Sequence, residues 1–85
     1  MAYSDIYKTT EFNGIDYPSW HGSPFDRGGM DSWYHRPQSP HYWPEGTGKG
    51  KEIVPPQMKP SEVDAYLAGY EYNELSGGKK DYGRD

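Results

Sequence analysis

Aromatic side chains outnumber branched aliphatic ones in this chain, and that balance limits the kind of core it can build. The sequence has nine Tyr, three Trp and two Phe but only seven Ile, Leu and Val. An aromatic ring buries a large area while its hydroxyl or indole N–H keeps a polar group. Such side chains are enriched where proteins recognise partners. The composition therefore predicts a weakly cored domain suited to binding.

The length of 85 residues allows one small domain, which we place at 1–85 with flexible ends at 1–22 and 79–85. Eleven Gly and eight Pro predict many turns and much irregular backbone. We expect a small α+β or mainly α fold that is rich in loops. The scarcity of aliphatic residues leaves open a chain that becomes ordered only when it binds.

Charge and residue usage exclude several classes of protein. Without Cys, the chain can form no disulfide, thiolate nucleophile or cysteine zinc ligand. No apolar run reaches the ~20 residues that span a bilayer. The first residues, Met1 to Asp5, lack the pattern of a signal peptide. We expect a cytoplasmic protein without a membrane partner.

A first helix is predicted at 24–36. Ser23 is a good N-cap, Pro24 suits the first helical position, and Asp26 completes a capping box. Pro37 disfavours helical geometry at the residue before it, which sets the expected end.

A second helix is predicted at 61–75, with Ser61 as its cap and Asp64 three residues later. Gly77-Gly78 is a natural stop. Four apolar side chains with helical spacing form one stripe: Val63, Tyr66, Leu67 and Tyr70.

Asn13-Gly14, which stands between two apolar residues, indicates a β-hairpin or a plain loop tip, because both residues tolerate positive φ. The segment 52–54 is a short strand candidate that can pair with Tyr42-Trp43.

Both predicted helices contain a ring followed three residues later by glycine. Because such residues share one helical face, a second helix can approach the glycine while packing on the ring. The pattern predicts a helical pair or is a coincidence in a chain rich in glycine and aromatic residues. The expected packing residues are Phe25, Gly28, Tyr66, Gly69 and Tyr70.

The candidate partner-binding site is a cluster of rings and cations in the middle of the chain: Arg27, Trp33, Tyr34, Arg36, His41, Tyr42 and Trp43. These residue types dominate interface hot spots and also stack on unpaired bases. The alternative is that the rings form the core, and we expect Trp33 to be the most buried of them.

Other chemistry has weaker support in the sequence. The spacing of His21, His35 and His41 matches no known metal-ligand pattern. The 46–51 loop lacks the spacing of a phosphate-binding loop. Ser23 and Ser61 are better explained as caps than as nucleophiles. We expect no catalytic residue, no metal and no cofactor.

Two short motifs resemble known proteins. The segment 65–71 resembles the second helix motif of the ribosome modulation factor family, and Phe25-x-x-Gly28 with Arg36, Pro40 and Tyr42 resembles its first. The wider centre, from Asp26 to His41, resembles small uncharacterised tailed-phage proteins. The resemblance implies a two-helix protein that binds ribosomal RNA and blocks ribosome function. The family is strongly basic, whereas this chain has a net charge of −4.

We therefore expect a non-enzymatic, phage-type interaction protein that binds and modulates a host protein or protein complex in the host cytoplasm. The alternatives are a ribosome- or RNA-binding modulator and a structural component of a virion or complex. Self-association into a homo-oligomer stays open.

Overall fold

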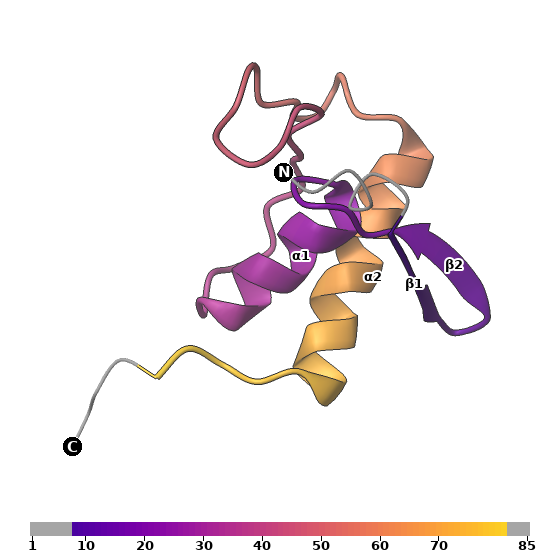
Figure 1. Cartoon of the computed structure of the whole chain (residues 1–85), viewed down its shortest axis with the longest axis vertical. Helices are drawn as coiled ribbons and strands as arrows, with labels where there is room; N and C mark the ends of the chain where they lie inside the picture. Colours follow the sequence, from indigo (N-terminus) through magenta and orange to yellow (C-terminus); the bar gives the residue numbers. More distant parts are fainter. Residues whose placement is uncertain (1–7, 82–85) are drawn as a thin grey trace.

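The computed structural model, which describes residues 8–81, contains a two-stranded antiparallel hairpin followed by two helices. In chain order these are β1 (Thr9–Phe12), β2 (Ile15–Pro18), α1 (Pro24–Trp33) and α2 (Pro60–Ser76). Figure 1 shows the helices crossing, with the hairpin beside them and the loops that join α1 to α2 at one end. The expected small α+β fold is confirmed.

The hairpin forms because Asn13 and Gly14 adopt the left-handed backbone that a two-residue type I′ turn requires, with φ of 54° and 81°. Phe12 pairs with Ile15 on either side of the turn. The hairpin packs on the helices through two ring contacts. Tyr17 stacks on Phe25 with 5.2 Å between ring centroids, and Phe12 meets Tyr72 edge-on at 5.7 Å.

The start of α1 follows the predicted N-cap. The Ser23 hydroxyl accepts from the Asp26 amide at 3.2 Å. The Asp26 carboxylate accepts at 2.9 Å from the amide of Gly22, one residue before the cap, rather than from that of Ser23 as in a capping box. The helix ends three residues before the predicted end, at Trp33. A Schellman turn stops it: His35 takes a φ of 63°, and the Arg36 amide donates to the Asp31 carbonyl at 2.8 Å.

The start of α2 differs from the prediction. Ser61 is not the cap. Pro60 takes the first helical position, Lys59 is the N-cap residue, and Glu62 accepts from the Lys59 amide at 2.8 Å. The reciprocal acid is therefore Glu62 rather than Asp64. The proline shifts the helix start because its missing N–H costs nothing at that position.

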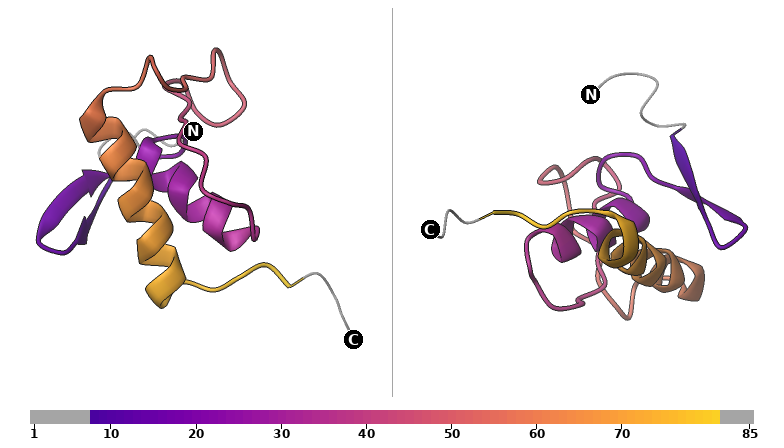
Figure 2. Two further views of the ribbon diagram at one scale, coloured as in Figure 1. Left: turned by 180° about the vertical axis from the view of Figure 1, so that it is seen from behind. Right: turned by 90° about the horizontal axis from the view of Figure 1, so that it is seen from below.

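The different views of Figures 1 and 2 show that the two helices cross. Their backbones approach each other at the two glycines of the repeated pattern. A Cβ on Gly28 would overlap the carbonyl oxygen of Tyr66, and a Cβ on Gly69 would overlap that of Phe25. Each glycine therefore lies against the backbone of the partner helix, beside that helix's ring residue.

The core lies around this crossing. Tyr66 is fully buried, and the other buried apolar residues are Phe25, Met58 and Ala65. Trp33 is only half-buried, so the expectation that it would be the most buried ring is wrong. It lies on the side of α1 away from Tyr66, where the Gly78 backbone packs against its ring.

The connection between the helices is irregular. The predicted strand at 52–54 is reduced to one antiparallel bridge, in which Tyr42 and Ile53 exchange backbone hydrogen bonds of 3.0 and 2.9 Å. The Trp43 amide also donates to the Gly22 carbonyl at 2.8 Å. These bonds fasten the connection to the start of α1.

The chain after α2 returns to α1. The Lys80 amide donates to the Trp33 carbonyl at 2.7 Å, and Lys79 forms an ion pair with Glu74. The predicted flexible ends fall partly on residues 1–7 and 82–85, outside the described residues. Within residues 8–81, neither helix is both long and apolar enough to cross a bilayer.

Candidate partner-binding cleft

Asp31 lies at the centre of a polar contact that joins α1 to α2 and to the chain after α1. Its side chain is on the buried face of α1, and the residue is only 4% exposed. One carboxylate oxygen accepts from Arg36 Nε at 2.9 Å, and the other accepts from the hydroxyl of Tyr66. Because a buried charge is costly without such partners, these bonds fix where the chain after α1 must run.

The hydroxyl of Tyr66 continues the network toward the connecting segment. It accepts from the Ser39 amide at 2.9 Å while it donates to Asp31. Burial and the hydrogen bond to Asp31 raise the pKa of Tyr66 well above its ordinary value of 10.0. The neutral phenol is therefore the form that the folded protein holds.

His41 connects the segment that contains Ser39 to Arg27 of α1. Its Nδ1 lies 2.7 Å from the Ser39 carbonyl oxygen, which can only accept, so Nδ1 carries a proton. Its Nε2 lies 3.2 Å from Arg27 Nε, which can only donate. The neutral tautomer protonated on Nδ1 satisfies both bonds and orients the Arg27 guanidinium.

A cleft of about 480 Å³ opens beside this network. Three segments line it: α1, the chain after it from Arg36 to Trp43, and the loop from Thr47 to Glu52. Of the seven predicted partner-binding residues, four line this cleft: Arg27, Arg36, His41 and Trp43.

The cleft is not a basic surface. Arg27 and Arg36 contribute two positive charges, and Asp31 and Glu52 contribute two negative charges. Arg36 is already paired with Asp31, although its side chain is 48% exposed. The charges of this site therefore suit a mixed polar and aromatic contact better than a run of phosphates.

The other three predicted residues lie elsewhere. Tyr34 lies under the guanidinium of Arg36, with 4.8 Å from the carbon of that group to the ring centroid. Tyr42 donates to Glu62 at 2.9 Å and lines a second groove. Trp33 lines a third pocket. Tyr42 and Trp43 are separated because an extended chain directs alternate side chains to opposite sides.

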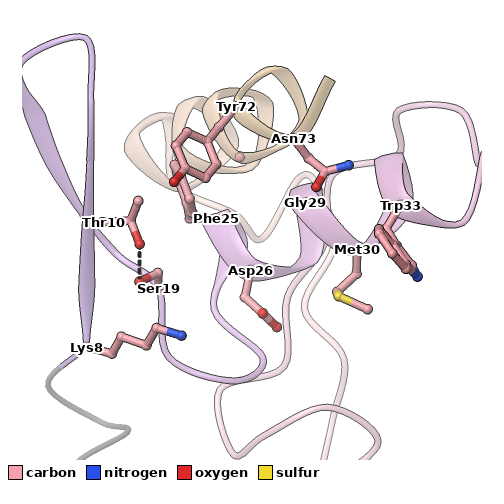
Figure 3. A pocket seen from close by; sticks show the side chains of 11 residues that line it. Lys8, Thr10, Ser19, Phe25, Asp26, Gly29, Met30, Trp33, Tyr72 and Asn73 are labelled. Atoms are coloured by element: carbon pink, nitrogen blue, oxygen red, sulfur yellow. Dashed lines mark hydrogen bonds between the residues drawn. The ribbon is translucent and has the colours of Figure 1, made fainter. Parts of the chain in front are cut away.

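The third pocket lies between α1, α2 and the hairpin (Figure 3). It has a volume of about 290 Å³, and Met30 and Trp33 contribute to it from α1. Tyr72 and Asn73 come from α2, and the hydrogen-bonded side chains of Thr10 and Ser19 come from the hairpin side. Six of the seven predicted residues are thus spread over three separate concave surfaces, and Tyr34 lines none of these three.

The predicted helix-packing residues lie together at or near the crossing. Phe25, Gly28, Tyr66 and Gly69 form the contact itself. The ring of Tyr70 lies 6.4 Å from that of Tyr66, and its hydroxyl donates to the Arg36 carbonyl. Tyr70 therefore also holds the chain that leads into the cleft.

Asp31 and Ser39 belong to this site but are not among the residues predicted from the sequence. The role of Asp31 could have been predicted, because its helical spacing from Gly28 places it on the contact face, where a carboxylate needs a hydrogen-bond partner. The role of Ser39 rests on its backbone amide, which no sequence pattern indicates. Among residues 8–81, no group of three His, Asp or Glu side chains has the arrangement of a metal site.

Comparison of the whole chain with protein-family models, with curated proteins and with solved structures gave no significant match.

Proposed function

We propose that this protein is a non-enzymatic interaction protein that binds another protein through the cleft beside Asp31. The observation that supports this most directly is the convergence of Arg27 from α1 with His41 and Trp43 from the chain after α1 onto one concave surface. Arginine and tryptophan are the side chains that most often carry binding energy at interfaces.

The cleft is also held in place before any partner arrives. Hydrogen bonds from Asp31, Tyr66 and His41 fix the segment that lines it, and Trp43 is tied by its amide to Gly22. A pre-ordered surface loses less conformational entropy on binding, which favours affinity. This supports recognition by a formed surface.

The balance of charge in the cleft favours a protein over a nucleic acid. Following the resemblance to small tailed-phage proteins, the partner would be a host protein or protein complex, which this chain modulates. The second candidate is a ribosome or RNA ligand, as the resemblance to ribosome modulation factor implies. Arg27 and Trp43 are also residue types that stack on bases.

The first test uses Trp43→Ala, with Trp33→Ala as the matched control. Both tryptophans are half-buried, but only Trp43 lines the cleft. Tagged wild-type protein captures partners from host lysate, and mass spectrometry and RNA sequencing identify them. Trp43→Ala should reduce binding to the purified partner by at least about tenfold, whereas Trp33→Ala should not. Equal losses in both variants would overturn the assignment of the cleft.

Salt dependence separates the two partner classes. A protein partner held mainly by aromatic contacts should remain bound between low and moderate salt. An RNA partner should lose affinity steeply, because phosphate contacts release counterions. Capture that disappears with moderate salt and with ribonuclease would replace the first candidate with the second.

A further inference from the structure

A second concave surface lies on the opposite side of the segment that borders the cleft. His41 and Trp43 face the cleft, whereas Tyr42 and Pro44 face a groove of about 550 Å³. The alternation follows from the extended backbone of this segment. The groove is therefore a distinct surface, and a ligand there does not depend on the proposed function of the cleft.

The groove is lined mainly by rings of two kinds. Tyr17, Trp20 and Tyr42 contribute aromatic faces, and Pro18, Pro24 and Pro44 contribute pyrrolidine rings. The aromatic side chains come from the hairpin, from the turn before α1 and from the connecting segment. Ala65 of α2 forms part of the wall. Grooves lined by aromatic side chains are the surfaces on which proline-rich segments dock.

The hydrogen-bonding groups of the groove suit the same kind of ligand. Within the part of the chain that the structure describes, the indole N–H of Trp20 donates to no protein acceptor. A polyproline II helix has no internal hydrogen bonds, so its carbonyl oxygens need donors from outside. An α-helical ligand uses most of its carbonyls internally and offers this indole fewer backbone acceptors.

The charges around the groove indicate what should flank the prolines. Asp16 and Glu62 both line it, and no Lys or Arg does. Glu62 is engaged by Tyr42 and by the Lys59 amide. Asp16 is exposed and forms no ion pair among residues 8–81. A basic side chain on the ligand would complement Asp16, whereas phosphates would be repelled.

We propose that this groove binds a proline-rich segment of a partner protein in polyproline II conformation, with an arginine or lysine placed beside Asp16. The prolines lie on Tyr17, Trp20 and Tyr42, and the indole of Trp20 donates to a ligand carbonyl.

The test is a titration of the ¹⁵N-labelled full chain with a synthetic oligoproline peptide that carries one terminal arginine. The three tryptophan indoles report on three different surfaces, and they are assigned from single Trp→Phe variants. The Trp20 indole resonance should shift saturably, while those of Trp33 and Trp43 should move little. A Trp20 signal that stays unchanged at millimolar peptide, or three indoles that shift alike, would overturn the proposal.

Two variants and two control peptides sharpen the result. Trp20→Phe keeps an aromatic face but removes the donor, and it should weaken binding by about tenfold. Asp16→Asn should weaken binding of the arginine peptide but not of an oligoproline with glutamine in its place. A glycine–serine peptide carrying the same arginine should not bind. If it binds equally, the groove recognises charge alone and the proposal fails.

A second copy of this chain is the competing occupant, because Arg36, Pro37 and Pro40 form a short segment of similar chemistry. Sedimentation of the free protein decides this. A monomer at the concentrations of the titration supports the partner peptide. A dimer that dissociates when the peptide is added would overturn it in favour of self-association.

Discussion

A carboxylate on the buried face of a helix destabilises a fold unless its oxygens accept hydrogen bonds. Asp31 meets this condition through Tyr66 on α2 and Arg36 on the chain after α1. The bond from Tyr66 joins two helices whose residues are 35 positions apart, and the bond from Arg36 holds the chain that directly follows α1. Asp31 therefore substitutes in part for the aliphatic contacts that the composition lacks, and it places Arg36 at the cleft.

Replacing Tyr66 with phenylalanine tests this role. The Tyr66→Phe variant should lose about 1–3 kcal/mol of unfolding free energy at neutral pH, because Asp31 and the Ser39 amide each lose a buried partner. The same variant should change how the unfolding free energy depends on alkaline pH. The folded pKa of Tyr66 is raised above the unfolded value of 10.0, so its stabilisation is complete below that pH. This stabilisation is lost as the pH rises above the unfolded pKa and through the folded pKa.

Urea unfolding at a series of pH values from about 8 to about 11 measures both effects. The wild-type unfolding free energy should fall over the upper part of this range, and that of Tyr66→Phe should fall less. Burial and the hydrogen bond to Glu62 also raise the pKa of Tyr42, so Tyr42→Phe should flatten the curve in the same direction. An alkaline fall that is identical in wild type and Tyr66→Phe would contradict the network.

Among the elements, the helical pair depends on close approach. Phe25 and Tyr66 supply the rings, while Gly28 and Gly69 allow the backbones to touch. The two helices bury rings against backbone rather than interdigitating long aliphatic side chains. This is how a chain with few Leu, Ile and Val can still form a closely packed contact.

Gly28→Ala should separate the helices, because the added methyl group would overlap the Tyr66 carbonyl. We expect a loss of about 3 kcal/mol or more, in the range of overpacked cores. Gly29→Ala is the matched control in the same helix, since its Cβ would lie 3.6 Å from the Gly69 carbonyl oxygen, an ordinary contact.

Gly29→Ala should be neutral or should stabilise by up to about 1 kcal/mol through helix propensity. Thermal unfolding followed by circular dichroism compares the two variants. Equal melting temperatures for Gly28→Ala and wild type would refute the close contact.

At the scale of the whole molecule, the cleft, the groove and the third pocket lie around one small core, and the chain after α2 covers the end of α1. Lys79 donates to the Ser32 carbonyl at 3.1 Å and pairs with Glu74, while the Lys80 amide reaches the Trp33 carbonyl. These contacts cover the end of α1, whose last carbonyls need donors.

Lys79→Ala should weaken these contacts without unfolding the protein. The ion pair is partly exposed, so the unfolding free energy should change little. Hydrogen exchange at the Lys80 amide should nevertheless become faster, because the segment that holds it loses its anchor. Lys49→Ala, at an exposed position of the 46–50 loop, should leave that exchange rate unchanged. Equal protection of the Lys80 amide in wild type and Lys79→Ala would contradict the anchoring role.

The short-range features of this fold could be predicted from sequence. Asn13-Gly14 determines its turn because both residues accept positive φ, and Ser23 begins α1 because its hydroxyl satisfies an amide three residues on. The ring and glycine pattern placed the helix contact, since residues three apart share a face. The earlier end of α1 escaped prediction. His35 stops the helix with a left-handed backbone, which residues other than glycine adopt uncommonly.

Only the tertiary structure decided which rings are buried and which surfaces they form. Tyr66 rather than Trp33 fills the centre, because Asp31 and the Ser39 amide lie where its hydroxyl can reach them. Tyr42 and Trp43 are adjacent in sequence, but they face a groove and a cleft on opposite sides of one segment. Local patterns determine backbone conformation over a few residues, whereas the side of a segment that faces inward depends on residues distant in the chain.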